Sequence, residues 1–225
     1  MELPGFIIHI IHGNLILERI KYCFDADDIK KFVTGILIPD SCRGEKKEIS
    51  HFIAPYSRDR ILQIPDVDAF ADKYREHLSE PFVMGYLAHL WLDKTFFEDF
   101  FLRNIQFQDE NGKPTLYPDN IRKVYLSRLN KYISVNELFS EDYLYGYYTA
   151  LNKSLIEKYN LAIPEKTVFH VPVDEVQLDD FDGILSDLEH YFSVCCTVPP
   201  VPVFDQNELE EFLSSEADNF LKYLT

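Results

Sequence analysis

The chain has 225 residues, of which 46% are hydrophobic and 27% charged. This composition is typical of a folded globular domain with a sizeable core rather than of a disordered segment. The formal net charge is −16, which argues against binding to nucleic-acid duplexes or to anionic membranes, because an acidic surface repels phosphates. A substrate that carries a phosphate would therefore have to be held locally, by a metal ion.

The cysteines and the start of the chain favour a cytoplasmic location. None of the four cysteines belongs to a CxxC motif, and the adjacent Cys195 and Cys196 cannot readily bridge to each other, so we expect reduced thiols. The apolar run at residues 6–11 lacks a basic region before it and a cleavage site after it, so we expect no signal peptide. No stretch is long enough to span a membrane, and we expect no stable membrane association.

In the first half of the chain, dense apolar residues predict a helix over 6–20, and possible N-caps at 25–28 predict a second helix that ends near residue 37. Pro39 then opens a polar loop over residues 40–50. Helical spacing returns at residues 65–79. The strongest pattern covers 81–104, where Pro81 suits a first helical turn and apolar residues cover most of the surface, so this helix should be central.

The second half predicts further helices at 121–132, 135–159, 182–192 and 207–223, after an Asn-Gly turn within the loop 108–118. Residues 167–173 have a brief β-like character, and the prolines at 199–202 suggest a stiff linker. We predict an all-α fold, a multi-helix bundle that forms a single domain over residues 1–225. Residues 197–225 could form a helical appendage to it.

Two polar residues interrupt the central helix. His89 and Asp93 are four residues apart, so they share one helical face and could hold one ion together. Their neighbours are apolar, and a carboxylate in such surroundings is costly unless it is paired or bound to a cation. Taken alone, the pattern is more typical of a hydrogen-bonded pair in a helical core than of a metal site.

The loop offers two more residues with ligand chemistry. Asp40 follows a proline at a helix end, and His51 comes eleven residues later. Considered singly, Asp40 fits a helix cap or a turn, and His51 fits a surface histidine.

The segments GILIPDS (35–41), SHF (50–52) and GYLAHLWLD (85–93) together resemble the zinc-dependent phospholipase C family, whose distant relatives include single-strand-specific nucleases. The resemblance covers residues 6–100. It implies a phospholipase C-like helical bundle around a buried metal site, with Asp40, His51, His89 and Asp93 as ligands. It also implies a histidine ligand from the first helix. His9 fits its distance to the glycine best, and His12, one turn further, could also face the site.

The chain departs from the family's pattern where a second metal would be held. Phe97 stands where the family has a further histidine, and no later HxxxE motif exists, because His170 is followed four residues on by Asp174 and His190 by Val194. Glu98, Asp99 or Asp142 could substitute, although nothing in their spacing singles one out. We therefore predict one well-formed zinc site without a clear ligand set for a second ion. Manganese or iron would suit the same ligands.

The resemblance implies hydrolysis of a small phosphoester, either a phosphodiester or a phosphomonoester. Zinc held by histidines and carboxylates lowers the pKa of bound water toward ~7 and stabilises charge on a phosphoryl oxygen. Asp40 would have a catalytic role, as the natural bridging carboxylate if two ions are present. The alternative is an inactive descendant with one structural metal or an interaction role. An HD-type phosphohydrolase would need a His-Asp dipeptide, which this sequence lacks.

Overall fold

The structure is a computed structural model that describes residues 3–20, 23–194 and 201–225. Those residues are mostly helical and include one small three-stranded sheet. The longer helices are α1 (Phe6–Ile20), α2 (Ala26–Leu37), α5 (Pro81–Thr95), α8 (Leu144–Tyr159), α9 (Phe181–Ser193) and α10 (Gln206–Tyr223), and the shorter ones are α3 (Glu45–Ser50), α4 (Val67–Lys73), α6 (Leu102–Asn104) and α7 (Val135–Leu138). Among them, none is both long and apolar enough to cross a membrane.

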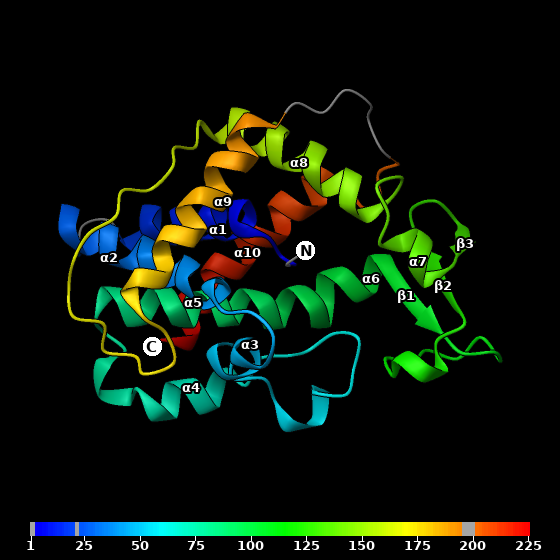
Figure 1. Ribbon diagram of the computed structural model, residues 1–225, viewed down its shortest axis with the longest axis horizontal. Helices are drawn as coiled ribbons and strands as arrows, with labels where there is room; N and C mark the ends of the chain where they lie inside the picture. Colours follow the sequence, from blue (N-terminus) through cyan, green and yellow to red (C-terminus); the bar gives the residue numbers. More distant parts are fainter. Residues whose placement is uncertain (1–2, 21–22, 195–200) are drawn as a thin grey trace.

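Helix α5 crosses the middle of the molecule and packs along α2 (Figure 1). The two helices approach so closely that a Cβ atom on Gly35 would lie 2.1 Å from the Phe82 carbonyl oxygen, and one on Gly85 would lie 2.1 Å from the Phe32 carbonyl oxygen. Only residues without a side chain fit at both points. The glycines therefore set the distance between α2 and α5.

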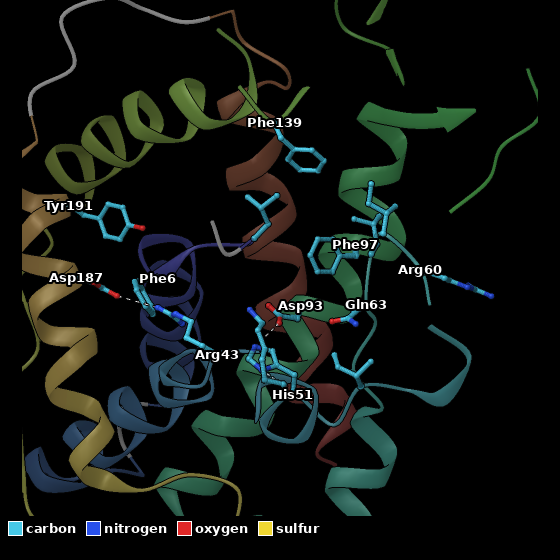
Figure 2. A pocket seen from close by; sticks show the side chains of 15 residues that line it. Phe6, Arg43, His51, Arg60, Gln63, Asp93, Phe97, Phe139, Asp187 and Tyr191 are labelled. Carbon is cyan, nitrogen blue, oxygen red and sulfur yellow. Dashed lines mark hydrogen bonds and ion pairs between the residues drawn. The ribbon is translucent and has the colours of Figure 1, made fainter. Parts of the chain in front are cut away.

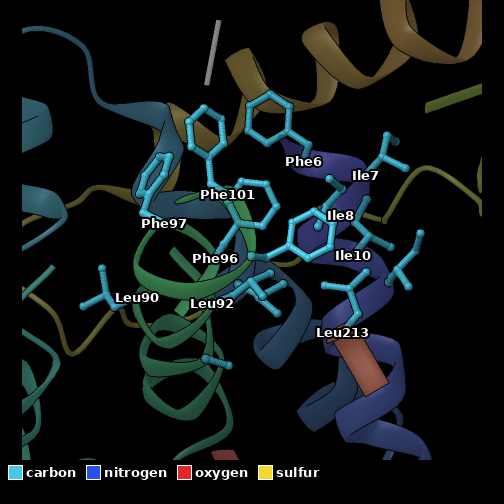
Figure 3. Close-up of a cluster of buried hydrophobic side chains, with 14 of the residues drawn as sticks. Phe6, Ile7, Ile8, Ile10, Leu90, Leu92, Phe96, Phe97, Phe101 and Leu213 are labelled. Carbon is cyan, nitrogen blue, oxygen red and sulfur yellow. The ribbon is translucent and has the colours of Figure 1, made fainter. Parts of the chain in front are cut away.

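The N-terminal helix packs against both the central helix and the C-terminal one, which also contact each other. Apolar side chains of α1, α5 and α10 meet in one buried cluster, to which the three helices contribute Phe6, Leu92 and Leu213 (Figure 3). Polar contacts add to it: Trp91 donates to Glu216 over 3.0 Å, and Arg19 bonds to Asp218 over 2.5 Å. Helix α10 thus closes over α1 and α5 as part of the same core.

The expectation of an all-α fold is too simple, because the helix predicted at residues 121–132 is wrong. That segment forms β2 (Lys123–Leu126) and most of β3 (Lys131–Ile133), which pair antiparallel with each other and with β1 (Ile105–Gln108). Val124 and Leu126 are buried on one face, while Tyr125 between them is partly exposed, which is the two-residue period of a strand. Asn130 supplies the left-handed turn between β2 and β3.

Other boundaries differ from the prediction. The polar loop over 40–50 contains a 3₁₀ turn (Ile38–Ser41) and α3, and the predicted helix 135–159 is divided into α7 and α8. The predicted helix 81–104 continues from α5 through a π-helical segment (Phe96–Phe101) into α6. Residues 167–173 form no strand. Two residues of the proline-rich linker, 199 and 200, lie outside the described part of the chain, as do Cys195 and Cys196.

The close crossing of α2 and α5 predicts that Gly85→Ala destabilises the protein strongly. The new methyl group would overlap the Phe32 carbonyl oxygen, and overpacking at a rigid backbone contact costs about 3 kcal/mol. Urea denaturation measures the change in the free energy of unfolding.

Gly183→Ala is the matched control, because it also places alanine in a helix but meets nothing within 4 Å. It should leave stability unchanged or raise it by up to about 1 kcal/mol, since alanine has the higher helix propensity. Equal stability of the two variants would contradict the proposed role of Gly85.

Candidate metal centre

Five side chains with ligand chemistry converge from four segments of the chain. His9 lies in α1, Asp40 in the 3₁₀ turn after α2, His51 at the C-terminal cap of α3, and His89 and Asp93 one turn apart in α5. Each is at most 5% exposed. Residues far apart in the sequence therefore lie together in a single buried cluster. Its shortest contacts, both 3.1 Å, join His9 Nε2 to Asp93 Oδ1 and His51 Nε2 to Asp40 Oδ1.

Hydrogen bonds to backbone carbonyls fix two of the imidazoles. His89 Nδ1 lies 2.9 Å from the Ile36 carbonyl oxygen, and His51 Nδ1 lies 3.2 Å from the Lys47 carbonyl oxygen. A carbonyl can only accept, so both Nδ1 atoms carry the proton and both Nε2 atoms are left as lone-pair donors. Histidines that bind metals are commonly held in this way by their other ring nitrogen.

The two lone pairs face each other and the carboxylates. His51 Nε2 and His89 Nε2 are 3.2 Å apart, while Asp93 Oδ2 is 3.6 Å from the first and 3.5 Å from the second. Atoms that can only accept hydrogen bonds repel at such distances unless a proton or a cation lies among them. The arrangement therefore needs a shared proton or a cation at its centre.

Several buried atoms of the cluster also have no hydrogen-bond partner. These are both ring nitrogens of His9, Asp40 Oδ2 and Asp93 Oδ1. His9 Nε2 and Asp93 Oδ1 are close, but their geometry is not that of a hydrogen bond. If His89 were also protonated at Nε2, that one proton could not satisfy all of these acceptor atoms. A divalent cation could, and the nitrogen and oxygen donors present fit zinc.

The donors form two overlapping groups, His9–His89–Asp93 and Asp40–His51–His89, each with its ligand atoms within 4.8 Å of one another. Both groups need His89, whose Nδ1 already bonds to the Ile36 carbonyl oxygen. Its single remaining lone pair can serve only one ion. Within the described residues, the cluster thus offers the ligands of one metal rather than of two.

The protonation states of His9, His51 and both carboxylates suit metal binding. Burial lowers the pKa of His9 and of His51, which favours their neutral, ligating forms. Despite burial, Lys47 and His89 hold the pKa of Asp40 well below its usual value, and His89 does the same for Asp93. Both carboxylates are therefore charged. Burial opposes the charged form of His89, but Asp93 and Asp40 raise its pKa, so among the three imidazoles this one favours the charged form until a metal displaces its proton.

A cavity of about 580 Å³ opens onto His51 and Asp93. Figure 2 shows these two side chains next to each other, with Arg43 and Asp187 on one side and Gln63 on the other. Aromatic and aliphatic side chains form much of the remaining wall, namely Phe6, Ile61, Leu62, Phe97, Phe139 and Tyr191. Arg43, Lys47 and Arg60 also line it, beside the acidic Asp93 and Asp187, so basic side chains outnumber acidic ones in this part of an acidic protein.

The other residues considered from the sequence lie apart from the cluster. His12 is buried one turn along α1, where burial and the neighbouring His9 lower its pKa to about 3, and its ring packs against Phe220. Exposed positions are occupied by Glu98, Asp99, Asp142, His170 and His190. Glu98 reaches Tyr56 and Asp99 reaches Arg103. None of the six belongs to the two ligand groups found among the described residues.

Sequence reasoning missed three residues that support the site. Lys47 Nζ lies 3.2 Å from Asp40 Oδ1. Its position in α3, four residues before the C-cap residue His51, would have been the signal if that helix had been predicted. Ser50 Oγ donates to the Pro39 carbonyl oxygen over 3.0 Å, and Tyr86 donates to the Ser50 carbonyl oxygen over 2.5 Å. The last two bonds tie α3 to the 3₁₀ turn after α2 and to α5.

Comparison with known proteins adds no relative: no protein-family model, curated protein or solved structure matches this chain. What can be inferred about the site therefore rests on its own residues.

The buried tie between Tyr86 and Ser50 predicts that Tyr86→Phe destabilises the protein by about 1–2 kcal/mol, because a buried carbonyl loses its donor. Tyr125→Phe is the control, since its hydroxyl bonds to Asn130 at the surface, and it should change stability by less than about 0.5 kcal/mol. Urea denaturation compares the two. A loss no larger for Tyr86→Phe than for Tyr125→Phe would show that the tie does not support the site.

Proposed function

We propose that this protein is a metal-dependent phosphoesterase-like hydrolase, which holds one divalent ion, zinc, through His9, Asp40, His51, His89 and Asp93. The observation that carries the proposal is the cluster of buried lone pairs at 3.1–3.6 Å, which opens onto a cavity lined by basic side chains. The function is also the one implied by the resemblance to the zinc-dependent phospholipase C family.

Zinc in this site would act as a Lewis acid that polarises a phosphoryl oxygen and lowers the pKa of water toward ~7. The protein's own residues prepare the site for that chemistry. Backbone carbonyls orient the rings of His51 and His89, so their Nε2 atoms need no reorganisation on binding. His9 stacks on His89, with ring centroids 3.9 Å apart, which holds both imidazoles at the same depth.

Only part of the cluster faces the cavity. His51 and Asp93 line it, whereas His9 and His89 do not. A substrate would therefore approach from the side of His51 and Asp93, with His9 and His89 behind them. Asp93 directs one oxygen toward His9 and the other toward His51 and His89. It can therefore bind the metal and, through His9, hold α1 in position against α5. The basic lining favours an anionic substrate such as a phosphoester.

Elemental analysis of the purified protein tests metal binding directly. We expect about one equivalent of zinc in the wild type, as for one set of mixed nitrogen and oxygen ligands. His89→Gln should lose most of it, because both ligand groups need this imidazole. His77→Gln is the matched control, since His77 lies exposed in the 3₁₀ turn Arg75–His77, and its side chain bonds to Glu80, the N-cap of α5. Equal zinc content in all three proteins, or none after reconstitution, would contradict the proposal.

Hydrolysis of 4-nitrophenyl phosphate and bis(4-nitrophenyl) phosphate by the same samples tests the reaction. Turnover that requires zinc and is lost in His89→Gln but kept in His77→Gln is the expected result. About one equivalent of zinc with no turnover of either ester would instead favour the inactive descendant, in which the metal is structural.

Zinc should also stabilise the fold, because the ligands converge only in the native state. At a free zinc concentration about 100-fold above its Kd, the melting temperature of the metal-free protein should rise by about 5–10 °C. His89→Gln should show a much smaller rise. Differential scanning calorimetry with and without zinc measures both, and an equal rise in the two proteins would point to binding elsewhere.

A further inference from the structure

Lys47 reaches the cluster from the cavity wall. Its Nζ atom lies 3.2 Å from Asp40 Oδ1, the same oxygen that His51 Nε2 approaches to 3.1 Å. The lysine side chain is 29% exposed, whereas that of Asp40 is 2% exposed. The ammonium thus connects the solvent-facing cavity with a buried carboxylate of the candidate metal site.

The position of Lys47 along the chain fixes this arrangement. Lys47 lies in α3, and His51 caps the C-terminal end of that helix four residues later, so both side chains reach the same oxygen of Asp40. Both also line the 580 Å³ cavity together with Asp93. A group bound in the cavity next to the metal would therefore lie next to the ammonium as well.

A phosphate group needs more positive charge than one zinc ion supplies. Phosphoesters carry negative oxygens beyond the one that a single metal polarises, and that charge must be neutralised for cleavage. The cluster holds ligands for one ion, and Phe97, one turn beyond Asp93, adds an apolar ring to the cavity wall. A second cation near the site would have to be a side chain.

The two arginines of the cavity are engaged elsewhere. Arg43 donates to the carbonyl oxygens of Asp40 and Cys42 and pairs with Asp187 over 3.3 Å. Arg60 lies over the rings of Tyr56 and Tyr117 and points away from His51 and Asp93 in Figure 2. Lys47 is the basic side chain that contacts a carboxylate of the cluster itself.

We propose that Lys47 binds the phosphate group of the substrate: its ammonium contacts a non-bridging phosphate oxygen beside the metal, in place of a second metal ion. This inference rests on the proposed function, because it needs a metal in the cluster. An ammonium is a compact point charge with three donors, so Lys47 can bond to Asp40 and to a phosphate oxygen at once. It makes Lys47 a substrate-binding residue.

Binding of inorganic phosphate to the zinc-loaded protein, measured by isothermal titration calorimetry, tests the inference without relying on turnover. Lys47→Gln should keep the wild-type zinc content and bind phosphate about 10- to 100-fold more weakly, as expected for one charge-assisted hydrogen bond. Lys47→Arg should recover part of the affinity. Lys46→Gln, which changes the exposed neighbouring lysine of α3, should bind as the wild type does.

The outcomes separate this inference from the proposed function. Phosphate affinity in Lys47→Gln equal to that of the wild type, with zinc retained, would overturn the inference alone. Loss of zinc from Lys47→Gln would also overturn it, because Lys47 would then support Asp40 rather than bind the anion. A wild-type protein that binds no zinc would overturn both. The inference would be supported if Lys47→Gln kept its full zinc content but bound phosphate weakly, while Lys46→Gln bound phosphate as the wild type does.

Discussion

The close crossing of α2 and α5 is the constraint on which the site depends. Gly35 and Gly85 let the two backbones approach so closely that a Cβ atom on either glycine would clash with a backbone carbonyl of the other helix. At this distance the Ile36 carbonyl, one residue after Gly35, meets His89, one turn after Gly85. A helix end leaves its last carbonyls without internal partners, so the end of α2 both orients the imidazole and delivers Asp40 beside it.

Helix packing therefore brings together side chains that electrostatic repulsion and desolvation would otherwise keep apart. Two carboxylates and three imidazoles lie together out of water, in a chain that already carries a net charge of −16. Such a cluster is costly unless a cation compensates it. Lys47 compensates part of the charge of Asp40, and a divalent metal at the centre would compensate the rest. The basic side chains of the neighbouring cavity add further positive charge beside the cluster.

The sequence predicts the helical parts of the fold well where the pattern is local. Apolar periodicity and prolines located α1, α2 and α5 within a few residues, and Asp25 caps α2 as expected. The sheet was missed because Val124 and Leu126 alternate over only four residues, too short a stretch to outweigh a helical interpretation. The π-helical segment after α5 was not predicted, because its buried phenylalanines continue the apolar pattern of the helix before it.

For the site, residue types and their order predict which side chains can act as ligands, and the structure brings those five together. Spacing alone could not distinguish His9 from His12, because one turn of α1 separates them and only the packing against α5 decides which ring reaches Asp93. Glu98 and Asp99 could not be excluded from the sequence, since the π-helical segment sets the direction of their side chains. Lys47 escaped notice because it acts through a helix that was expected to be a loop.

The central claim is that buried imidazoles and carboxylates hold one zinc ion. X-ray absorption at the zinc edge of the reconstituted protein tests it most directly. The account predicts a first shell of nitrogen and oxygen atoms at about 2.0–2.1 Å, with the outer-shell scattering of imidazole rings. Sulfur ligation at about 2.3 Å, or an all-water shell without imidazole scattering, would place zinc elsewhere and contradict the account.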